Sequence, residues 1–206
     1  MSSRVLVLGT HNRKKRAELE VLLAPLGFEL HILADYPNAL EVEETGETFA
    51  ANAALKAVEQ AKHLKRWVLG EDSGLAVDAL QGAPGVYSAR YSGPQATDES
   101  NNQKLLADLQ GVPWEKRSAH YVCQLALSDP SGQLRAERQA TCRGRIRTEP
   151  SGEGGFGYDP LFEIVEYHRT FGEMGGAFKA AVSHRARAIR EFLPLVRALA
   201  PVWNEV

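Results

Sequence analysis

Residues 67–80 read Trp-Val-Leu-Gly-Glu-Asp-Ser-Gly-Leu-Ala-Val-Asp-Ala-Leu: an apolar run, a polar segment bounded by glycines, and a second apolar run. Short apolar runs that end at glycine are typical of buried strands. We therefore predict one strand at residues 67–69, a polar segment at 70–74 and further strand at 75–80. Asp72 does not resemble a solvated loop acid, because it follows an apolar strand and is enclosed by glycines and a serine.

Strands and helices alternate on both sides of this segment. Apolar runs and helical spacing predict strands at 4–9, 28–33 and 161–165, helices at 14–26, 49–65, 98–109 and 185–199, and a long hairpin from 119–127 to 133–146 with its turn at 129–132. This alternation, with the hairpin inserted, predicts an α/β fold with a mixed β-sheet and flanking helices.

The composition indicates an ordinary soluble globular protein. The 206 residues suit one domain, or one domain with two closely packed lobes, and 44% are hydrophobic. A formal net charge of −2 argues against an RNA-binding module and against nucleic acid as a partner. No apolar run approaches the ~20 residues that span a membrane, and the two cysteines are expected to be buried thiols, so we expect a cytoplasmic protein.

The first candidate site lies where the first strand meets the first helix. The segment reads Gly9-Thr10-His11-Asn12-Arg13-Lys14-Lys15, and backbone N–H groups at a helix start with such side chains beside them favour a phosphate. The alternative is an ordinary strand-to-helix turn with solvated lysines. The segment lacks the glycine and lysine spacing of a P-loop.

The second candidate consists of the acidic pairs Glu43-Glu44 and Glu71-Asp72. A nucleoside triphosphate normally arrives with Mg²⁺, a hard cation that prefers carboxylate oxygens and keeps several waters. Carboxylates at strand ends or in adjoining loops could hold that ion and activate its water. Solvated loop acids are the alternative, and Glu44 fits that alternative well.

Two further candidates follow in the C-terminal half. The glycine-rich stretch 154–160 presents Phe156, Gly157, Tyr158 and Asp159, which suit stacking on a base and hydrogen bonding to it; a hairpin turn with structural aromatics is the alternative. Lys179 and the run Ser183-His184-Arg185 suit an anion or a polar base edge, or else a surface cap. Asn52 and Lys56, four residues apart on a helix, are a weaker addition.

Taken together and in order, these segments resemble the inosine triphosphate pyrophosphatase family, whose members act on non-standard purine nucleoside triphosphates (dITP/XTP pyrophosphatases). The resemblance runs from Val5 to Ala188. It is carried by five motifs: Thr10-x-Asn12-x-x-Lys15-x-x-Glu18, Glu43-Glu44-Thr45-Gly46 with Asn52 and Lys56, Asp72-Ser73-Gly74-Leu75 continuing to Tyr91, Gly155-Phe156-Gly157-Tyr158-Asp159-Pro160, and Ser183-His184-Arg185.

The resemblance implies hydrolysis of ITP, dITP or XTP to the monophosphate and pyrophosphate, with Mg²⁺. It implies one domain over residues 1–206, a homodimer, and an elongated mixed sheet with two lobes around a central nucleotide cleft. Asp72 would be the proton acceptor and, with Glu43, a metal ligand. The other implied contacts are Thr10, His11, Asn12, Arg13, Lys14, Lys15, Lys56 and Ser73 for the triphosphate, with Lys15 also stabilising the leaving group, and Phe156, Gly157, Tyr158, Asp159, Lys179, His184 and Arg185 for the base.

Two positions depart from the family's pattern. Glu71 stands where bacterial members commonly have aspartate, which lengthens the side chain next to Asp72. The stretch Gly175-Gly176-Ala177-Phe178 replaces the acidic residues usual before Lys179, so the sequence does not predict where the local helix begins. Two rival interpretations remain open: a Maf-like pyrophosphatase acting on other nucleotides, and a non-catalytic nucleotide sensor.

Overall fold

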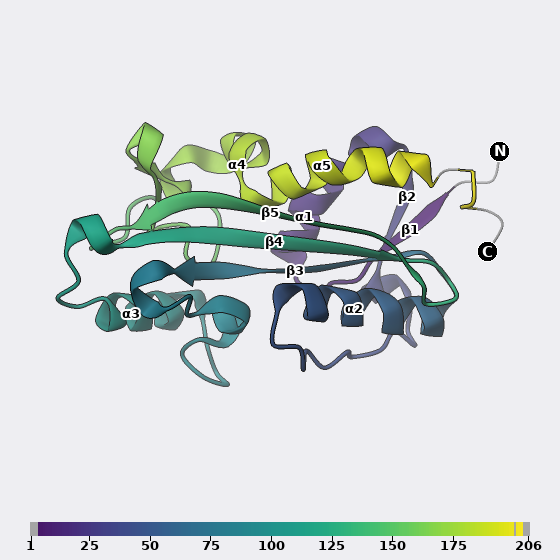
Figure 1. Cartoon of the computed structure of the whole chain (residues 1–206), viewed down its shortest axis with the longest axis horizontal. Coiled ribbons are helices and arrows are strands. Elements are labelled where there is room, and N and C mark those ends of the chain that lie inside the picture. The colour runs from purple at the N-terminus through teal and green to yellow at the C-terminus, as the bar shows by residue number, and fades with distance from the viewer. Residues whose placement is uncertain (1–3, 200, 204–206) are drawn as a thin grey trace. The chain divides into compact units, whose positions relative to one another are not determined.

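In the computed structural model, which describes residues 4–199 and 201–203, seven strands of these residues form one sheet (Figure 1). The strand order is β2-β1-β3-β4-β5-β6-β7. The strands are β1 (Val5–Leu8), β2 (Glu29–Ile32), β3 (Val68–Val77), β4 (Ser118–Ser128), β5 (Leu134–Ile146), β6 (Phe162–Ile164) and β7 (Arg169–Thr170).

The sheet is mixed, as the sequence predicted. β1 pairs in parallel with both β2 and β3, whereas β6 pairs antiparallel with β5 and β7. The α-helices of the described residues are α1 (Arg13–Leu23), α2 (Phe49–Leu64), α3 (Asp98–Asp108), α4 (Phe171–Val182) and α5 (His184–Ala198). Among residues 4–199 and 201–203, none of the helices combines the length and the apolar character that a bilayer crossing requires.

The chain divides into two compact units. The first contains the described parts of Met1–Asp72, Cys123–Ala140 and Arg185–Val206, and the second contains Ser73–Val122 and Thr141–His184. Strands β3, β4 and β5 therefore each contribute residues to both units.

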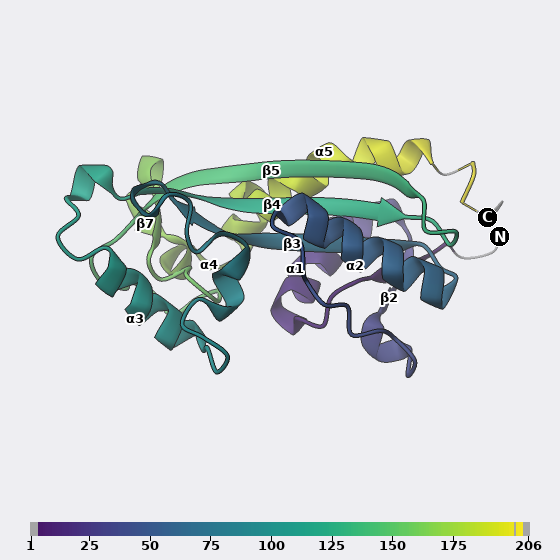
Figure 2. The same cartoon turned by 60° about the horizontal axis from the view of Figure 1, so that its bottom comes forward.

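In the first unit, helices cover both faces of the strands. Buried side chains of α1 and α5 pack with those of β1 and β4 in one cluster that includes Leu8, Leu19, Leu125 and Phe192. On the other face, Ala53 and Ala57 of α2 pack against Ala126 of β4. Figures 1 and 2 show α2 and α5 on opposite sides of these strands.

In the second unit, α3 and the start of α4 enclose a separate core. Leu105 of α3, Leu109 directly after that helix, and Phe171 of α4 share a buried cluster with Tyr121 of β4 and Phe162 of β6. The rings of Phe162 and Phe171 stack with centroids 5.4 Å apart. Tyr158 and Leu161, in the loop that follows β5, belong to the same buried cluster.

Two sequence predictions were wrong in detail. β3 runs without interruption from Val68 to Val77, so the polar segment 70–74 with Asp72 is part of the strand, and residues 78–80, predicted as strand, form a short 3-10 helix. Glycine in a strand can mark the close approach of another backbone, and Gly70 has that role here. Helix α4 was missed because Gly175 interrupts it, with a φ of 74° that places this residue in the left-handed region.

Gly70 allows α2 to lie close to β3. A Cβ at this position would meet the backbone carbonyl of Ala53 and would lie 2.8 Å from the backbone nitrogen of Ala57. Both alanines are completely buried. Glycine on the strand and alanine on the helix therefore fix how near α2 comes, and α2 carries Asn52 and Lys56 toward the polar segment of β3.

We predict that Gly70→Ala lowers the free energy of unfolding by about 1–3 kcal/mol, because the added methyl overpacks a rigid backbone contact. Gly176→Ala is the control, since a Cβ there would meet no heavy atom within 4 Å. Urea unfolding of both variants measures the difference. Equal stability of the two variants would contradict the close packing of α2 on β3.

Candidate functional site

The loop after β1 is organised by Asn12, which caps α1. The Oδ1 atom of Asn12 accepts hydrogen bonds from the backbone N–H groups of Lys14 and Lys15, each at 3.0 Å. The backbone N–H of Asn12 donates to the Oγ1 atom of Thr10 at 3.1 Å. The segment predicted to bind phosphate is therefore a preorganised helix start, while Asn12 itself has a structural role as its cap.

Glu71 on β3 is a buried carboxylate surrounded by cations. It is 1% exposed and accepts a hydrogen bond from Arg185 at 3.0 Å, while the Nζ of Lys15 lies 3.5 Å from its other oxygen. Arg185, also 1% exposed, donates to Glu18 as well. Burial disfavours the charge of Arg185, but Glu71 and Glu18 outweigh that effect and raise its pKa.

Asp72, the next residue of β3, faces α2. Its Oδ1 accepts a hydrogen bond from Lys56 at 3.0 Å, and Asn52 donates to its Oδ2 at 3.4 Å. Lys56 also lies 3.3 Å from Glu44. Burial raises the pKa of Asp72, although Lys56 and Lys15 oppose that rise. The carboxylate is thus desolvated and oriented, which are properties that an active-site base requires.

Glu43 and Glu44 differ in their surroundings. Glu43 is exposed, whereas Glu44 contacts Lys56 and, by charge repulsion, contributes to the raised pKa of Asp72. No group of three or more His, Cys, Asp or Glu residues with metal-binding geometry occurs within the described part of the chain. Mg²⁺ bound with a nucleotide needs only one or two protein carboxylates, so the chemistry of Asp72 with a neighbouring glutamate fits this ion.

A second polar group lies within the second unit, around Asp159. This residue is 1% exposed, and its Oδ2 accepts hydrogen bonds from Lys179 at 2.6 Å and from the backbone N–H of Phe156 at 2.8 Å. The ammonium of Lys179 lies 4.2 Å from the centre of the Phe156 ring. Tyr121 donates a longer hydrogen bond, of 3.4 Å, to Asp159. An aromatic face, an ammonium donor and a carboxylate acceptor are therefore held together.

The glycine-rich stretch and His184 are fixed by contacts that sequence reasoning did not identify. Tyr158 donates to the carbonyl of Ser88 at 2.8 Å, and Asn102 donates to the carbonyl of Gly157 at 3.0 Å. The ring of His184 stacks on Tyr121, with centroids 4.7 Å apart. Asn102 and Tyr121 gave no signal in the sequence, and Ser88 was noted only as part of the motif that ends at Tyr91, because their contacts depend on which loops the fold brings together.

The predicted site residues therefore fall into two groups, one in each unit. In the first unit, Lys15, Lys56, Asp72 and Arg185 surround the polar segment of β3, while Thr10, Asn12, His11, Arg13 and Lys14 form the exposed loop and helix start beside it. The second unit contains Phe156, Gly157, Tyr158, Asp159, Lys179 and His184. The half-buried Ser73, which follows Asp72 on β3, is also assigned to that unit. Arg185 belongs to the first group by its contacts, although it was predicted to contact the base.

Comparison with known proteins identifies relatives over nearly the whole chain. The model of the Ham1 family matches residues 6–195. A dITP/XTP pyrophosphatase from Rhodopirellula baltica is 59% identical over 189 residues, which cover 92% of this chain and 91% of the relative. A dITP/XTP pyrophosphatase from an Exiguobacterium species is 50% identical, and the alignment covers 93% of this chain and 98% of that relative.

Solved structures agree with these sequence matches. The structure of a HAM1 protein from Coxiella burnetii superposes with a TM-score of 0.86 at 36% identity, covering 94% of this chain and 98% of the other. The crystal structure of a nucleoside-triphosphatase, or dITP/XTP pyrophosphatase, from Mycobacterium abscessus gives a TM-score of 0.76 at 42% identity, covering 93% and 99%. Both confirm the mixed α/β fold.

Removing the buried cation of Arg185 is expected to destabilise the protein. Arg185→Met removes the cation that donates to the buried carboxylate of Glu71, which should lower the free energy of unfolding by about 3–5 kcal/mol. The control is Arg187→Met, an exposed position on the same helix, where a loss below about 1 kcal/mol is expected. Equal losses in urea unfolding would show that Arg185 does not neutralise Glu71.

Proposed function

The chain belongs to the Ham1 family, and from this membership we propose that it hydrolyses non-standard purine nucleoside triphosphates, such as dITP, ITP and XTP, to the monophosphate and pyrophosphate. The observation that carries the proposal is the position of Asp72, a buried carboxylate of β3 held between Lys56 and Asn52. A hydrolase acting on a phosphoanhydride bond requires such an oriented base next to cations.

We propose that the first group of residues binds the triphosphate. Lys15 and Lys56 supply positive charge beside the buried carboxylates, and the start of α1 supplies the side chains of residues 10–14 at the positive end of the helix dipole. Ser73 follows Asp72 directly on β3 and would border the reacting phosphate. Phosphoryl transfer depends mainly on positioning and electrostatics, which this arrangement can provide.

In the proposed reaction, Asp72 accepts a proton from a water molecule as the oxygen of that water bonds to the α-phosphorus. The bond from the α-phosphorus to the bridging oxygen breaks, and pyrophosphate leaves with its charge stabilised by Lys15 and Lys56. Asn52, which donates to the second oxygen of Asp72, keeps the first oxygen directed at Lys56 and the reacting groups. Burial raises the basicity of the carboxylate that performs this step.

We propose Mg²⁺ as the cofactor. Asp72 would hold it. The family resemblance implies Glu43 as the second carboxylate. Glu44 is the alternative that we favour, because Lys56 contacts both Glu44 and Asp72. When bound, the ion neutralises phosphate oxygens and lowers the pKa of a coordinated water. The cations Lys56 and Lys15 remain in place to orient the phosphate chain.

We propose that the second group recognises the base. Phe156 offers a face for stacking, and Lys179 offers a donor whose position Asp159 fixes. Hypoxanthine and xanthine carry a 6-oxo acceptor, which matches a donor, whereas adenine carries a 6-amino donor. A buried mismatch of this kind discriminates by a factor of order 10⁴. Gly157, Tyr158 and His184 would shape this site and, by their contacts, keep it rigid.

The remaining proposals rest on the family resemblance. We propose a homodimer located in the cytoplasm, with the purine nucleoside triphosphate as the partner and no role for nucleic acid or membranes. Size-exclusion chromatography with light scattering measures the oligomeric state directly.

A substrate panel tests the proposed function. Purified protein with Mg²⁺ is given ITP, dITP, XTP, GTP, ATP, dUTP and TTP, and the release of pyrophosphate and monophosphate is followed. We expect kcat/KM for ITP and XTP to exceed that for ATP by several orders of magnitude, with loss of activity in EDTA. Activity confined to pyrimidine nucleotides would favour a Maf-like enzyme, and binding without turnover would favour a sensor.

Asp72→Asn is expected to lower kcat for ITP by about 10²–10⁴-fold, because the amide cannot accept the proton. Binding of ITP should persist, since Lys15 and Lys56 remain. Asp78→Asn is the control: Asp78 directly follows β3 and is exposed. A kcat near the native value for Asp72→Asn, measured by stopped assay, would refute the role of Asp72.

The two candidate metal carboxylates can be separated by paired variants. We expect Glu44→Gln to raise the Mg²⁺ concentration needed for half-maximal activity at least about tenfold. Even groups that only orient the ligands of a metal typically contribute 10–100-fold to its affinity. Glu43→Gln should have a smaller effect, since Glu43 is exposed. The reverse order of the two effects would assign the ligand to Glu43.

A further inference from the structure

Residues 82–91 belong to the longest motif in the sequence, yet the proposed reaction uses none of their side chains. Part of this run, Gly85–Arg90, forms a short 3-10 helix in the second unit. The carbonyl of Ser88 accepts hydrogen bonds from the hydroxyl of Tyr158 at 2.8 Å and from the amide of Asn101 at 3.4 Å. The run therefore contacts the stretch that we propose to recognise the base.

Helix α3 holds the same stretch one residue earlier. The Nδ2 of Asn102 donates a hydrogen bond to the carbonyl of Gly157 at 3.0 Å. Asn101 and Asn102 are neighbours in the chain, and so are Gly157 and Tyr158. The hydrogen bonds therefore close a ring within the second unit, which we call the base brace and which consists of Ser88, Asn101, Asn102, Gly157 and Tyr158.

The brace acts at a residue that has little conformational preference of its own. Gly157 has a φ of 62°, and glycine adopts positive and negative φ about equally readily. A Cβ at this position would meet no heavy atom within 4 Å, so packing around the α-carbon does not fix it. The bond from Asn102 fixes the orientation of the peptide group that follows Gly157.

Gly157 is in turn part of the tight turn that carries the groups proposed to meet the base. The backbone N–H of Phe156 donates to the carboxylate of Asp159 at 2.8 Å, and the backbone N–H of Asp159 donates to the carbonyl of Phe156 at 3.2 Å. A rotation at Gly157 would therefore move the ring of Phe156 relative to Asp159.

The amide of Asn102 is not explained by stability. Its Oδ1 is buried and accepts no hydrogen bond from the described residues. A buried acceptor without a partner costs about as much free energy as one neutral hydrogen bond contributes. The donor of Asn102 and its orphaned acceptor thus have opposing effects on stability, and the position that the donor gives to Gly157 remains as the net result.

We propose that Asn102 is a positioning residue for base recognition, acting through Gly157. This inference rests on the proposed function of the second group. The ammonium of Lys179 lies 4.2 Å from the centre of the Phe156 ring and donates to Asp159 at 2.6 Å. The stacking face and the donor for the base are therefore aligned by one turn, and the brace sets the position of that turn.

Three variants test the proposal in the ITP hydrolysis assay. Asn102→Leu removes the donor and the orphaned acceptor but keeps a side chain of similar size and shape. Tyr158→Phe removes only the hydroxyl that donates to Ser88. Gln103→Leu is the matched control, because Gln103 is the next residue of α3 and is exposed. Urea unfolding of each variant is measured beside the kinetics.

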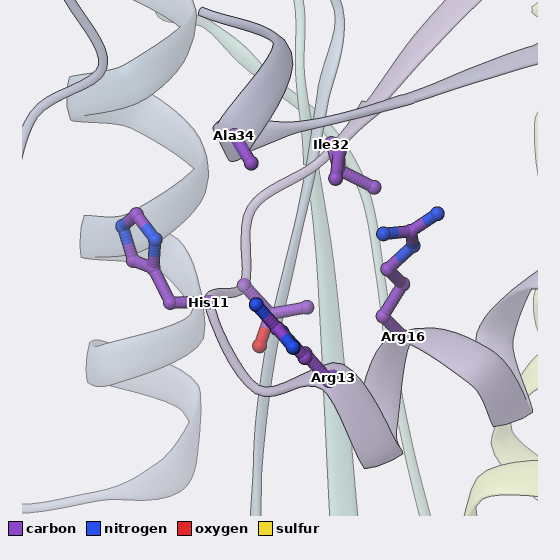
Figure 3. Close-up of a pocket in the computed structure, with 6 residues that line it drawn as sticks. His11, Arg13, Arg16, Ile32 and Ala34 are labelled. Carbon is purple, nitrogen blue, oxygen red and sulfur yellow. The ribbon is translucent and has the colours of Figure 1, made fainter. Parts of the chain in front are cut away.

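Inorganic tripolyphosphate lacks a base and, as a competitor of ITP, reports on the first group alone. Thr10, His11 and Arg13, which the proposed function assigns to the triphosphate, line a cavity of about 310 Å³ in the first unit (Figure 3). Asn102 and Gly157 belong to the second unit. The inhibition constant of tripolyphosphate therefore separates a change in base recognition from a general disturbance of the protein.

We expect Asn102→Leu to raise KM for ITP about three- to tenfold, the effect of one neutral hydrogen bond. The value of kcat should stay within about twofold, since a contact that contributes only to binding changes KM alone. The urea midpoint and the inhibition constant of tripolyphosphate should not change. Tyr158→Phe should raise KM in the same way, and Gln103→Leu should change none of these quantities.

An unchanged KM for ITP in Asn102→Leu would overturn the proposal. Equal losses for ITP and tripolyphosphate, or a lower urea midpoint in both Asn102→Leu and Tyr158→Phe, would also overturn it, because either result indicates a purely structural role. Failure of the proposed function appears differently, as an absence of ITP turnover in the native protein.

Discussion

The structure of the first unit depends on two adjacent buried carboxylates. Glu71 and Asp72 lie side by side in sequence on β3, and each is at most 4% exposed. Charged groups are stable in such surroundings only when cations and hydrogen bonds compensate their desolvation. Arg185 and Lys15 compensate Glu71, and Lys56 compensates Asp72. Helices α5, α1 and α2 are thereby tied to one point of one strand.

Close backbone packing makes this compensation possible. The alanines of α2 and the absence of a side chain at Gly70 let that helix approach β3, so a lysine and an amide reach Asp72. The Asn12 cap of α1 similarly fixes the backbone position from which the side chain of Lys15 extends. In the second unit a different arrangement serves a different chemistry, because Asp159 holds Lys179 against an aromatic ring. The two polar groups are thus built from separate sets of residues.

The sequence predicted the mixed sheet, most helices and most residues of both polar groups, since apolar periodicity and motif order are local properties. It did not reveal that residues 70–74 continue the strand, because glycine and polar residues interrupt the apolar pattern there. It placed Arg185 with the base, whereas the structure buries this residue against Glu18 and Glu71. Such partnerships join residues far apart in the chain, and only the fold determines them.

The proposal that water attacks the α-phosphorus, assisted by Asp72, can be tested by hydrolysing ITP in water enriched in ¹⁸O. Mass spectrometry then locates the label in the products. The proposed mechanism predicts one ¹⁸O atom in inosine monophosphate and none in pyrophosphate. Label in the pyrophosphate, or release of inorganic phosphate in its place, would contradict the mechanism and the position assigned to Asp72.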